Sequence, residues 1–563
     1  MEKANTMSQN PYLFYDSITA PFTPEDFTDD DVLIAKTAEL FVKTEVKPKL
    51  GDIEKQQHAE VVNLFRKAGE LGLLSIEIPE DYGGFQLDKS ISGVVAEKLG
   101  WAGSFSVSFN IHAGVGTLPY IYYGTEEQKQ KYLLKLGSGE WIGAYALTES
   151  NAGSDALNAK TTAKQLDDGS WVINGEKQWI TNANVADVFL VFAKSDQGMT
   201  AFIVDRDFKG VSIGAEEEKM GIKGSSTATL ILADCPVPSE NVLGDIGKGH
   251  LVALNILNLA RLKLSFANIG TAKQALQLAI HYAEERQQFG KSISEFHMIQ
   301  EKLANMALAI FGAESISYRT AGYIDEVLNS KDSTEGFNSL VSAFALEASI
   351  CKVFGSEALA SNVDEAVQIH GGNGYMKDYT VEALYRDARI SRIFEGTNEI
   401  NRLTIAKNAL KRTSLPSSIK DLNKKEQLTR QEGYLVGAAE LFDKILKALT
   451  QKRQPKNIEQ ELMRILADVT SELYVMDSCY KRSLKHPDHE VIQLLSETIC
   501  EEGFYKIASG AAVMIACLYE NEMEREEKLN EVSSIYVPIR SQTLIKKRKI
   551  AQAILQKGQY FTV

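Results

Sequence analysis

Residues 389–402 contain the side chain that is best suited, by its type and its neighbours, to act as a catalytic group. They place one carboxylate, Glu395, between the apolar pair Ile393-Phe394 and a Gly-Thr step. Removal from water raises the pKa of a carboxylate, which makes it a usable base near neutral pH. Gly396 would let a ligand approach the backbone closely. From these residues alone, a helix cap or a solvated glutamate is the commoner outcome, so Glu395 is first only a candidate base.

Two further segments could hold a flat, polar ligand. Residues 144–155 combine hydroxyl side chains with Gly153, a composition typical of a turn with free backbone N–H groups. Residues 179–182 place the large ring of Trp179 beside the hydroxyl of Thr181. An ordinary turn and a packed core tryptophan are the commoner outcomes for such segments. No Gly-x-Gly-x-x-Gly lies between a strand and a helix, so a dinucleotide would have to be held differently.

Hydrophobic periodicity divides the chain into helical and β-like regions. Helical spacing covers about residues 30–135, and β-like runs follow from 141 to about 243, with a hairpin signal at Asp167-Asp168-Gly169. Helical spacing returns at about 249 and continues past a linker at 414–418 to about 557. We therefore expect a multidomain α+β fold. Its domains are a helical N-terminal domain (1–139), a β-barrel or sandwich middle domain (140–246), a helical bundle (247–412) and an extra helical C-terminal domain (413–563).

Composition narrows the class of partner and the compartment. With a net charge of -14, the chain lacks the basic excess that nucleic-acid binding needs. Its five cysteines form no Cys-x-x-Cys pair, which favours reduced, mostly buried thiols, and His486 and His489 flank Pro487 in a loop, so no metal site is expected. The first thirty-one residues are acidic rather than basic and apolar, and no run of about eighteen apolar residues occurs, so we expect neither a secretory signal nor a transmembrane helix. The expected location is the cytoplasm, in a bacterium.

These separated motifs occur in the order of one family. Over residues 30–412 the chain resembles the acyl-CoA dehydrogenase flavoenzymes, and Glu395 falls on their catalytic base. The two β-region segments resemble the flavin-binding face of the family's middle domain. Ser150 stands where the family has a proline, and a serine stiffens the turn less than a proline does. The resemblance implies FAD contacts from Tyr145, Leu147, Thr148, Ser154, Trp179 and Thr181, with Ser154 also near the acyl-CoA.

Two later segments resemble the parts of the family that reach FAD from a neighbouring subunit. Residues 285–290 contain Arg286, whose guanidinium suits a pyrophosphate, and residues 368–375 form a Gly-rich turn. From the residues alone they would be a solvated helix end and a tight turn. The resemblance implies at least a homodimer. The further FAD residues it implies are Arg286, Gln288, Phe289, Gln368, Gly371, Gly372, Thr397 and Glu399.

The resemblance also implies a substrate site on the helix that begins near residue 249. Arg261 falls on a substrate-contacting arginine, while Asn258 stands where many members have an aspartate. The implied substrate residues are Ser154, Asn258, Arg261 and Gly396. The isovaleryl-type branch carries its base on this same helix, but no Glu occurs between residues 253 and 261, so Glu395 stays the expected base.

The implied reaction is FAD-dependent α,β-dehydrogenation of fatty acyl-CoA, of medium to long chain, to trans-2-enoyl-CoA in fatty-acid β-oxidation. The electrons would pass to an electron-transferring flavoprotein. An acyl-CoA oxidase and a catalytically weak assembly factor on the same scaffold stay open as alternatives. We expect the floor of the acyl pocket to depend on residues 107–115.

The part beyond residue 412 resembles the extension of the very-long-chain branch by position and length. It holds no catalytic motif, so we expect it to serve stability or assembly. Its basic segment, residues 545–550, could form a helix on an anionic membrane. A helix packed against its own domain is the commoner outcome for such a charge run.

Overall fold

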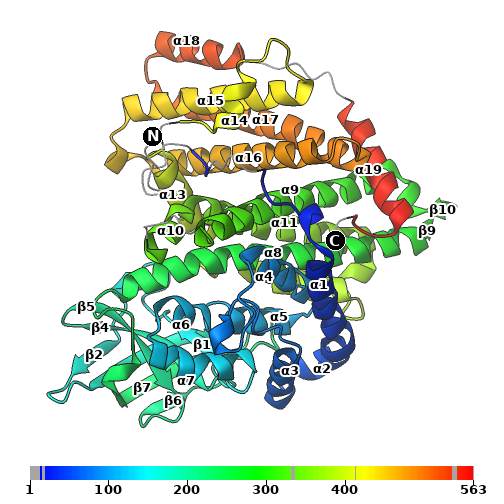
Figure 1. The fold of residues 1–563 in the computed structure, drawn as a ribbon. Coiled ribbons are helices and arrows are strands. Elements are labelled where there is room, and N and C mark those ends of the chain that lie inside the picture. The colour runs from blue at the N-terminus through cyan, green and yellow to red at the C-terminus, as the bar shows by residue number, and fades with distance from the viewer. Residues whose placement is uncertain (1–12, 16–19, 331–335, 413, 536–541, 562–563) are drawn as a thin grey trace. The chain divides into compact units, whose positions relative to one another are not determined.

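The computed structural model describes residues 13–15, 20–330, 336–412, 414–535 and 542–561. The first twelve residues, on which the interpretation of the N-terminus as lacking a signal partly depends, lie outside these ranges. The chain forms two compact units (Figure 1). We call them the mixed unit, residues 27–271 and 386–396, and the helical unit, residues 1–26, 272–385 and 397–563. Each is described separately.

The helices of the mixed unit begin at good capping residues and bury one apolar face. Thr28 and Thr125 each form a capping box, in which the threonine hydroxyl and the side chain three residues later satisfy each other's backbone N–H groups. Helical spacing buries Val61, Leu64 and Phe65 on one face of their helix. The helices are α1 (Asp29–Phe41), α2 (Leu50–Ile53), α3 (His58–Glu70), α4 (Lys89–Leu99), α5 (Ser104–Ala113), α6 (Leu118–Tyr123), α7 (Glu126–Gly137) and the part of α8 (Gly249–Glu285) that ends at Thr271.

The strands of the mixed unit form an eight-stranded sheet within the described residues, in the order β6-β7-β3-β2-β4-β5-β8, with β1 parallel to β4. The hairpin expected at Asp167-Asp168-Gly169 is confirmed, because β2 and β3 pair antiparallel across it and Gly169 takes the left-handed φ of 86°. The sheet is open rather than a closed barrel. Its strands are β1 (Gly143–Ala146), β2 (Thr162–Gln165), β3 (Trp171–Thr181), β4 (Val188–Ser195), β5 (Gly198–Asp205), β6 (Val211–Ile213), β7 (Thr227–Val237) and β8 (Val242–Leu243).

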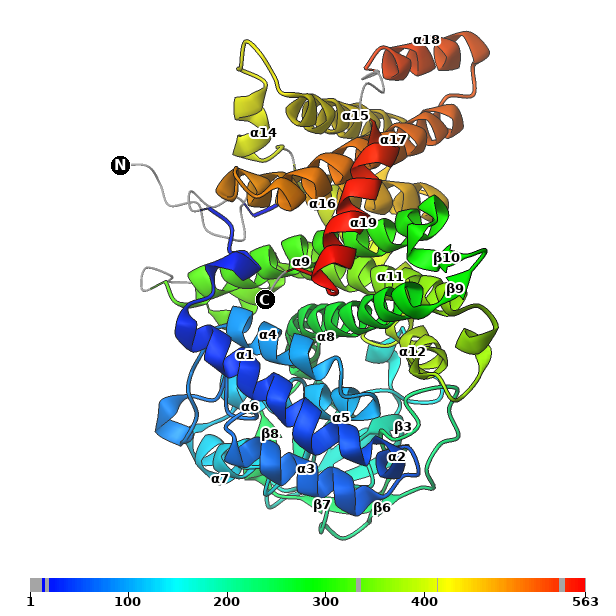
Figure 2. The same ribbon diagram turned by 90° about the vertical axis from the view of Figure 1, so that its right-hand side faces the viewer.

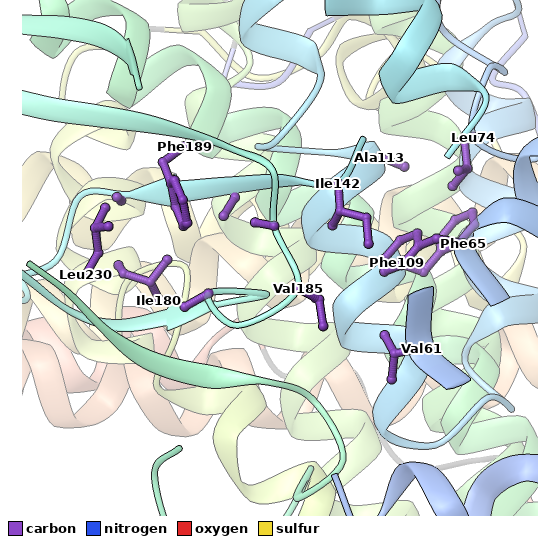
Figure 3. Close-up of a cluster of buried hydrophobic side chains, with 14 of the residues drawn as sticks. Val61, Phe65, Leu74, Phe109, Ala113, Ile142, Ile180, Val185, Phe189 and Leu230 are labelled. Atoms are coloured by element: carbon purple, nitrogen blue, oxygen red, sulfur yellow. The ribbon is translucent and has the colours of Figure 1, made fainter. Parts of the chain in front are cut away.

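Helices and sheet of the mixed unit share one apolar core. Phe65 and Phe109 come from helices, while Phe189 and Leu230 come from strands, and all four are buried in the same cluster (Figure 3). Such burial contributes roughly 25 cal/mol per Å² of apolar surface. The strands that carry the candidate site residues are therefore fixed to a helical scaffold rather than standing as a separate layer.

The helical unit holds the rest of the expected helical bundle and the extension beyond residue 412. Helices α15, α16 and α17 lie side by side within it (Figure 2), and α16 also packs on α9. The expected helical bundle and further helical section are confirmed. Besides the ends of α8 and the short β9 (Gln287–Gln288) and β10 (Lys291–Ser292), its elements are α9 (His297–Leu328), α10 (Phe337–Ala343), α11 (Ala345–His370), α12 (Thr380–Ala388, up to Tyr385), α13 (Asn398–Ala409), α14 (Ser417–Leu422), α15 (Arg430–Lys452), α16 (Gln460–Lys485), α17 (Glu490–Leu518), α18 (Glu522–Ser533) and α19 (Thr543–Lys557).

A buried charge network joins α16 to α9 and to both ends of the described chain. The guanidinium of Arg482 is fully buried and donates to Glu25 at 3.1 Å and to Glu314 at 3.1 Å. Lys273 pairs with Glu314 at 2.6 Å, and the hydroxyl of Tyr560 donates to Glu314 at 3.1 Å. Burial opposes the charge of Arg482, but the two carboxylates outweigh it and raise the pKa of the guanidinium. The extension therefore docks through satisfied charges as well as through its apolar face.

The basic segment of α19 pairs with acidic side chains of α17. Lys546 lies 2.6 Å from Glu497, and Lys547 lies 2.5 Å from Glu502. Ile550 and Ile554 of the same helix are buried. These contacts account for the charge run as a helix packed within its own unit, which favours that interpretation over the membrane-surface one.

Among the described residues, no single helix is both long enough and apolar enough to cross a membrane. The bent pair formed by residues 337–343 and 345–375 meets that test by length and composition.

Replacing Arg482 by alanine should destabilise the helical unit strongly, because it leaves the buried Glu314 and its neighbours without the central cation. We expect the free energy of unfolding to fall by about 3–5 kcal/mol, measured by urea denaturation monitored by circular dichroism. The control is Lys506→Ala, which removes an exposed ion pair of the same region with Glu472 and should change stability by less than about 1 kcal/mol. Equal effects of the two substitutions would contradict this role for the buried network.

Candidate active site

The backbone around Glu395 makes a sharp turn at the start of a helix. The short 3-10 helix Arg389–Arg392 ends just before it, and α13 begins just after it. Glu395 and Gly396 take successive left-handed φ angles of 55° and 83°. For a residue other than glycine this conformation costs roughly 1–2 kcal/mol. Such strain persists only where the surroundings enforce it, and it is typical of functional sites.

Arg261 holds this turn from α8. Its Nε donates to the carbonyl oxygen of Glu395 at 3.2 Å, and its Nη1 donates to Oδ1 of Asn258 at 2.9 Å. Burial lowers the pKa of Arg261, and the negative charge of Glu395 opposes that effect. Asn258 lies one turn before Arg261 on the same helix face, so it orients the guanidinium. The structure thus brings together three of the residues singled out in the sequence: Glu395, Arg261 and Asn258.

Tyr145 places an unpaired hydroxyl near the same carboxylate. Its ring, on β1, packs on Phe192 with centroids 5.1 Å apart, and its Oη is buried with no hydrogen-bond partner among the described residues. Burial, and then the charge of Glu395, raise the pKa of Tyr145 well above its usual value. A buried hydroxyl without a partner is costly, which points to a ligand that would satisfy it.

Tyr123 and Asn255 belong to this group but were missed in the sequence. Tyr123 contributes to the raised pKa of Tyr145. Nδ2 of Asn255 donates to the hydroxyl of Tyr123 at 3.3 Å. The available signal was spacing on α8, where Asn255, Asn258 and Arg261 recur every three residues and so share one face. From the sequence alone, where the contact to Tyr123 is not visible, this polar face would be interpreted as solvent-exposed.

Trp179 stands on a β-bulge. The pairing of β3 with β7 shifts register between Lys177 and Ile180, and Trp179 has a left-handed φ of 58°. A bulge re-aims a side chain, and here 58% of the indole is exposed although it lies in a long strand. A packed core tryptophan is therefore excluded, and the ring can offer its face to a ligand. Thr181 ends the same strand, half-buried.

Glu149 anchors the turn that carries Leu147, Thr148 and Ser154. Its carboxylate accepts from the backbone N–H of Thr161 at 3.0 Å and from the ammonium of Lys177 at 2.8 Å. Burial alone would raise the pKa of Glu149, but these donors lower it to about 2. Ser154 stays exposed at the end of the anchored turn. The role of Glu149 was missed, because its partners lie 12 and 28 residues further along the chain.

In the helical unit, the turn after α8 exposes three candidate residues. Gln288 belongs to β9, which pairs with β10, and Phe289 has a left-handed φ of 53°. The side chain of Phe289 is 93% exposed, and Arg286 and Gln288 are exposed as well. An apolar ring that is exposed on a tight hairpin is typical of a contact with another molecule.

The Gly-rich turn after α11 is held from behind by aromatic contacts. His370 stacks on Tyr282 with ring centroids 4.2 Å apart, and Nδ2 of Asn373 donates to the Tyr282 hydroxyl at 3.0 Å. Gly371 has a φ of 58°, and it is exposed together with Gln368 and Gly372. Further along the unit, Thr397 caps α13 by accepting from the N–H of Ile400, and Glu399 is exposed in the first turn.

Family models match three successive parts of the chain. The "Acyl-CoA dehydrogenase, N-terminal domain" matches residues 28–140, the "Acyl-CoA dehydrogenase, middle domain" matches residues 144–235, and the "Acyl-CoA dehydrogenase, C-terminal domain" matches residues 247–410. The candidate residues fall inside these matched parts.

Relatives extend the likeness beyond residue 410. A Bacillus subtilis (strain 168) protein named "Probable acyl-CoA dehydrogenase" is 43% identical over 96% of both chains. The human "Very long-chain specific acyl-CoA dehydrogenase, mitochondrial" is 34% identical over 82% of this chain and 76% of its own. A crystal structure of an acyl-CoA dehydrogenase complexed with FAD from Bacillus anthracis is 42% identical, with a TM-score of 0.92 over 98% of this chain and 100% of its own. On these grounds the chain belongs to the acyl-CoA dehydrogenase family.

Proposed function

We propose that the protein catalyses the FAD-dependent α,β-dehydrogenation of fatty acyl-CoA thioesters, with Glu395 as the base. The observation that carries the proposal is the strained turn at Glu395, held by buried Arg261 and close enough to Tyr145 for its charge to raise the pKa of that hydroxyl, which has no partner among the described residues. Membership of the family supports the reaction class.

The residues present fit a flavin. Trp179 offers an exposed aromatic face, Tyr145 a hydroxyl that lacks a partner in the described part of the chain, and Ser154 an exposed hydroxyl on an anchored turn. We assign Leu147, Thr148 and Thr181 to the same contact surface. The FAD-bound relative from Bacillus anthracis supports this assignment. When bound, FAD supplies the two-electron oxidation by accepting the substrate's β-hydrogen as a hydride.

The chain's own residues handle the α-proton and the thioester. As the Cα–H bond breaks, the carboxylate of Glu395 accepts the proton, and the β-hydrogen departs with its electron pair, so that the enoyl double bond forms. The backbone N–H of Glu395 stabilises the thioester oxygen as negative charge develops on it. Arg261, Asn258 and Gly396 shape the substrate end of this site, and Arg261 fixes the turn through the Glu395 carbonyl.

We further propose that the flavin site is shared between copies of the chain, in at least a homodimer. The exposure of Phe289 and of the Gly-rich turn supports contacts with a second subunit. An electron-transferring flavoprotein is the proposed electron acceptor, and the four-domain division at residues 139, 246 and 412 is kept as part of the proposal. The residues assigned to the shared contacts are Arg286, Gln288, Phe289, Gln368, Gly371 and Gly372. Thr397 and Glu399 are assigned to FAD binding without a choice of subunit.

For the acyl chain we propose a medium to long substrate bounded by α5. Val107 and Ile111 lie four residues apart on this helix and are partly accessible, whereas Phe109 and Ala113 are buried. They therefore form one apolar face that does not belong to the core of the mixed unit. An apolar face of this kind suits the methylene chain of a fatty acyl group.

Replacing Glu395 by glutamine should abolish most turnover while leaving fold and flavin content intact, because the amide cannot accept the α-proton. We expect kcat to fall by at least about 10²–10⁴-fold with an artificial electron acceptor. Glu440→Gln, an exposed substitution on α15, is the control. Near-normal activity of Glu395→Gln would contradict the assignment. In the same assay, wild-type turnover with oxygen alone as acceptor would favour the oxidase alternative.

Replacing Arg286 by alanine should weaken flavin retention, because a charge-assisted contact to the pyrophosphate would be lost. If that contact crosses subunits, flavin loss and dissociation of the dimer should appear together. The measurements are the visible flavin absorbance per chain and the molecular mass by light scattering. Arg66→Ala, at an exposed position of α3, is the control. Flavin content and mass equal to the wild type would count against a shared site.

Replacing Ile111 by phenylalanine should shorten the preferred acyl chain by adding bulk to the accessible face of α5. We expect kcat/KM for long-chain acyl-CoA to fall about tenfold relative to short-chain acyl-CoA, within the range that a few methylene groups decide. A turnover series over chain lengths measures this. Leu134→Phe, at an exposed position of α7, should leave the profile unchanged. An unchanged profile for Ile111→Phe would remove α5 from the pocket.

A further inference from the structure

Helix α13, which follows the strained turn at Glu395, packs between the bundle and the extension. It contacts α11 on one side and α16 on the other. Arg402, in the second turn of α13, donates from Nε to Oδ1 of Asp468 on α16 at 2.6 Å. Its two terminal nitrogens donate to the two carboxylate oxygens of Glu357 on α11, at 2.8 and 3.0 Å. One guanidinium thus clamps α13 between carboxylates from both neighbouring helices.

The clamp continues to the first residue of α13. Buried Asn398 donates from Nδ2 to Oε1 of Glu357 at 3.0 Å, the same oxygen that Arg402 contacts at 2.8 Å. Its Oδ1 accepts from the ammonium of Lys352 at 2.7 Å and from the hydroxyl of Ser356 at 3.3 Å. Asp468 and Asn398 are therefore linked through Arg402 and Glu357 in a continuous network of hydrogen bonds.

The geometry of this network makes it stronger than an ordinary surface pair. Isolated exposed ion pairs contribute little, but bidentate arginine–carboxylate pairs and charge networks are the exceptions. Burial opposes the charge of Arg402, whereas Glu357 and Asp468 outweigh it and raise the pKa of the guanidinium. Without Asp468, the cation would be held from α11 alone, and α16 would lose its charged contact with α13.

The network ends three residues after the proposed base. Asn398 is preceded by Thr397, whose hydroxyl caps α13, and then by the left-handed pair Gly396 and Glu395. The covalent chain is short here, so the position of the first turn of α13 limits where the Glu395 backbone can lie. A displacement of about 1 Å at a catalytic group can cost roughly 10²-fold in rate.

From this juxtaposition we infer that Asp468, in the extension, is a positioning residue for the proposed base. Through Arg402 and Asn398 it holds the first turn of α13, and with it the turn that carries Glu395. The extension therefore contributes to catalysis without touching the substrate. This inference rests on the proposed function.

The test replaces Asp468 by asparagine, which keeps its size and removes its charge, in the full-length flavin-bound protein. We expect kcat to fall about fivefold to tenfold, with KM changed less than twofold, because binding is intact and only the position of the base is altered. Independently of activity, hydrogen exchange of the backbone amides of residues 396–402 should accelerate at least threefold. Asp468→Glu, which retains the carboxylate, should restore both values partly.

The matched control is Glu472→Gln, one turn further along α16, which removes an ion pair with exposed Lys506 on α17 rather than with a residue of α13. We expect wild-type kcat and wild-type exchange in residues 396–402. The inference is overturned if Asp468→Asn keeps wild-type exchange in that segment, or if Glu472→Gln reproduces its loss. A wild-type protein without dehydrogenase activity would refute the proposed function, whereas the exchange measurement would still decide whether Asp468 holds α13.

Discussion

The contact between the Arg261 guanidinium and the carbonyl oxygen of Glu395 is the constraint on which the candidate site depends. It ties a strained, left-handed residue to α8, a helix of 37 residues. The arginine therefore fixes the backbone of the residue that we propose as the base. Charge-assisted hydrogen bonds are about twice as strong as neutral ones, which suits a contact that must offset backbone strain.

The same solution, a buried charge that fixes backbone position, recurs through the molecule. Glu149 anchors the turn that ends at Ser154, and Arg482 joins α16 to α9. Burying charges costs desolvation energy, so such groups add less net stability than apolar packing of the same volume. Their effect is instead on arrangement, because any alternative packing would leave a charge without its partner. Within each unit, apolar packing supplies cohesion, and the charged groups define how the elements meet.

Short-range patterns in the sequence predicted the architecture, whereas most of the candidate residues came from the resemblance to the family and stay predictions. Alternation of apolar residues and the turn at Gly169 were enough for the hairpin of β2 and β3. The bulge that exposes Trp179 could not be predicted, since it depends on the register between β3 and β7. Glu149 and Arg482 were missed for a related reason. Their partners are distant in sequence, up to 457 residues for the pair of Arg482 and Glu25.

That last pair has a consequence for how the protein is made. Glu25 and Tyr560, near opposite ends of the described chain, contact the same buried Arg482–Glu314 pair. During translation, Glu25 is made more than 450 residues before Arg482, so this ion pair can form only late in synthesis. The helical unit therefore cannot complete its fold while the chain is being synthesised. By contrast, almost all of the mixed unit has been synthesised by residue 271. Contacts between residues this far apart in sequence form slowly. The apolar faces of the helical unit therefore stay exposed during synthesis, when chaperones can bind them.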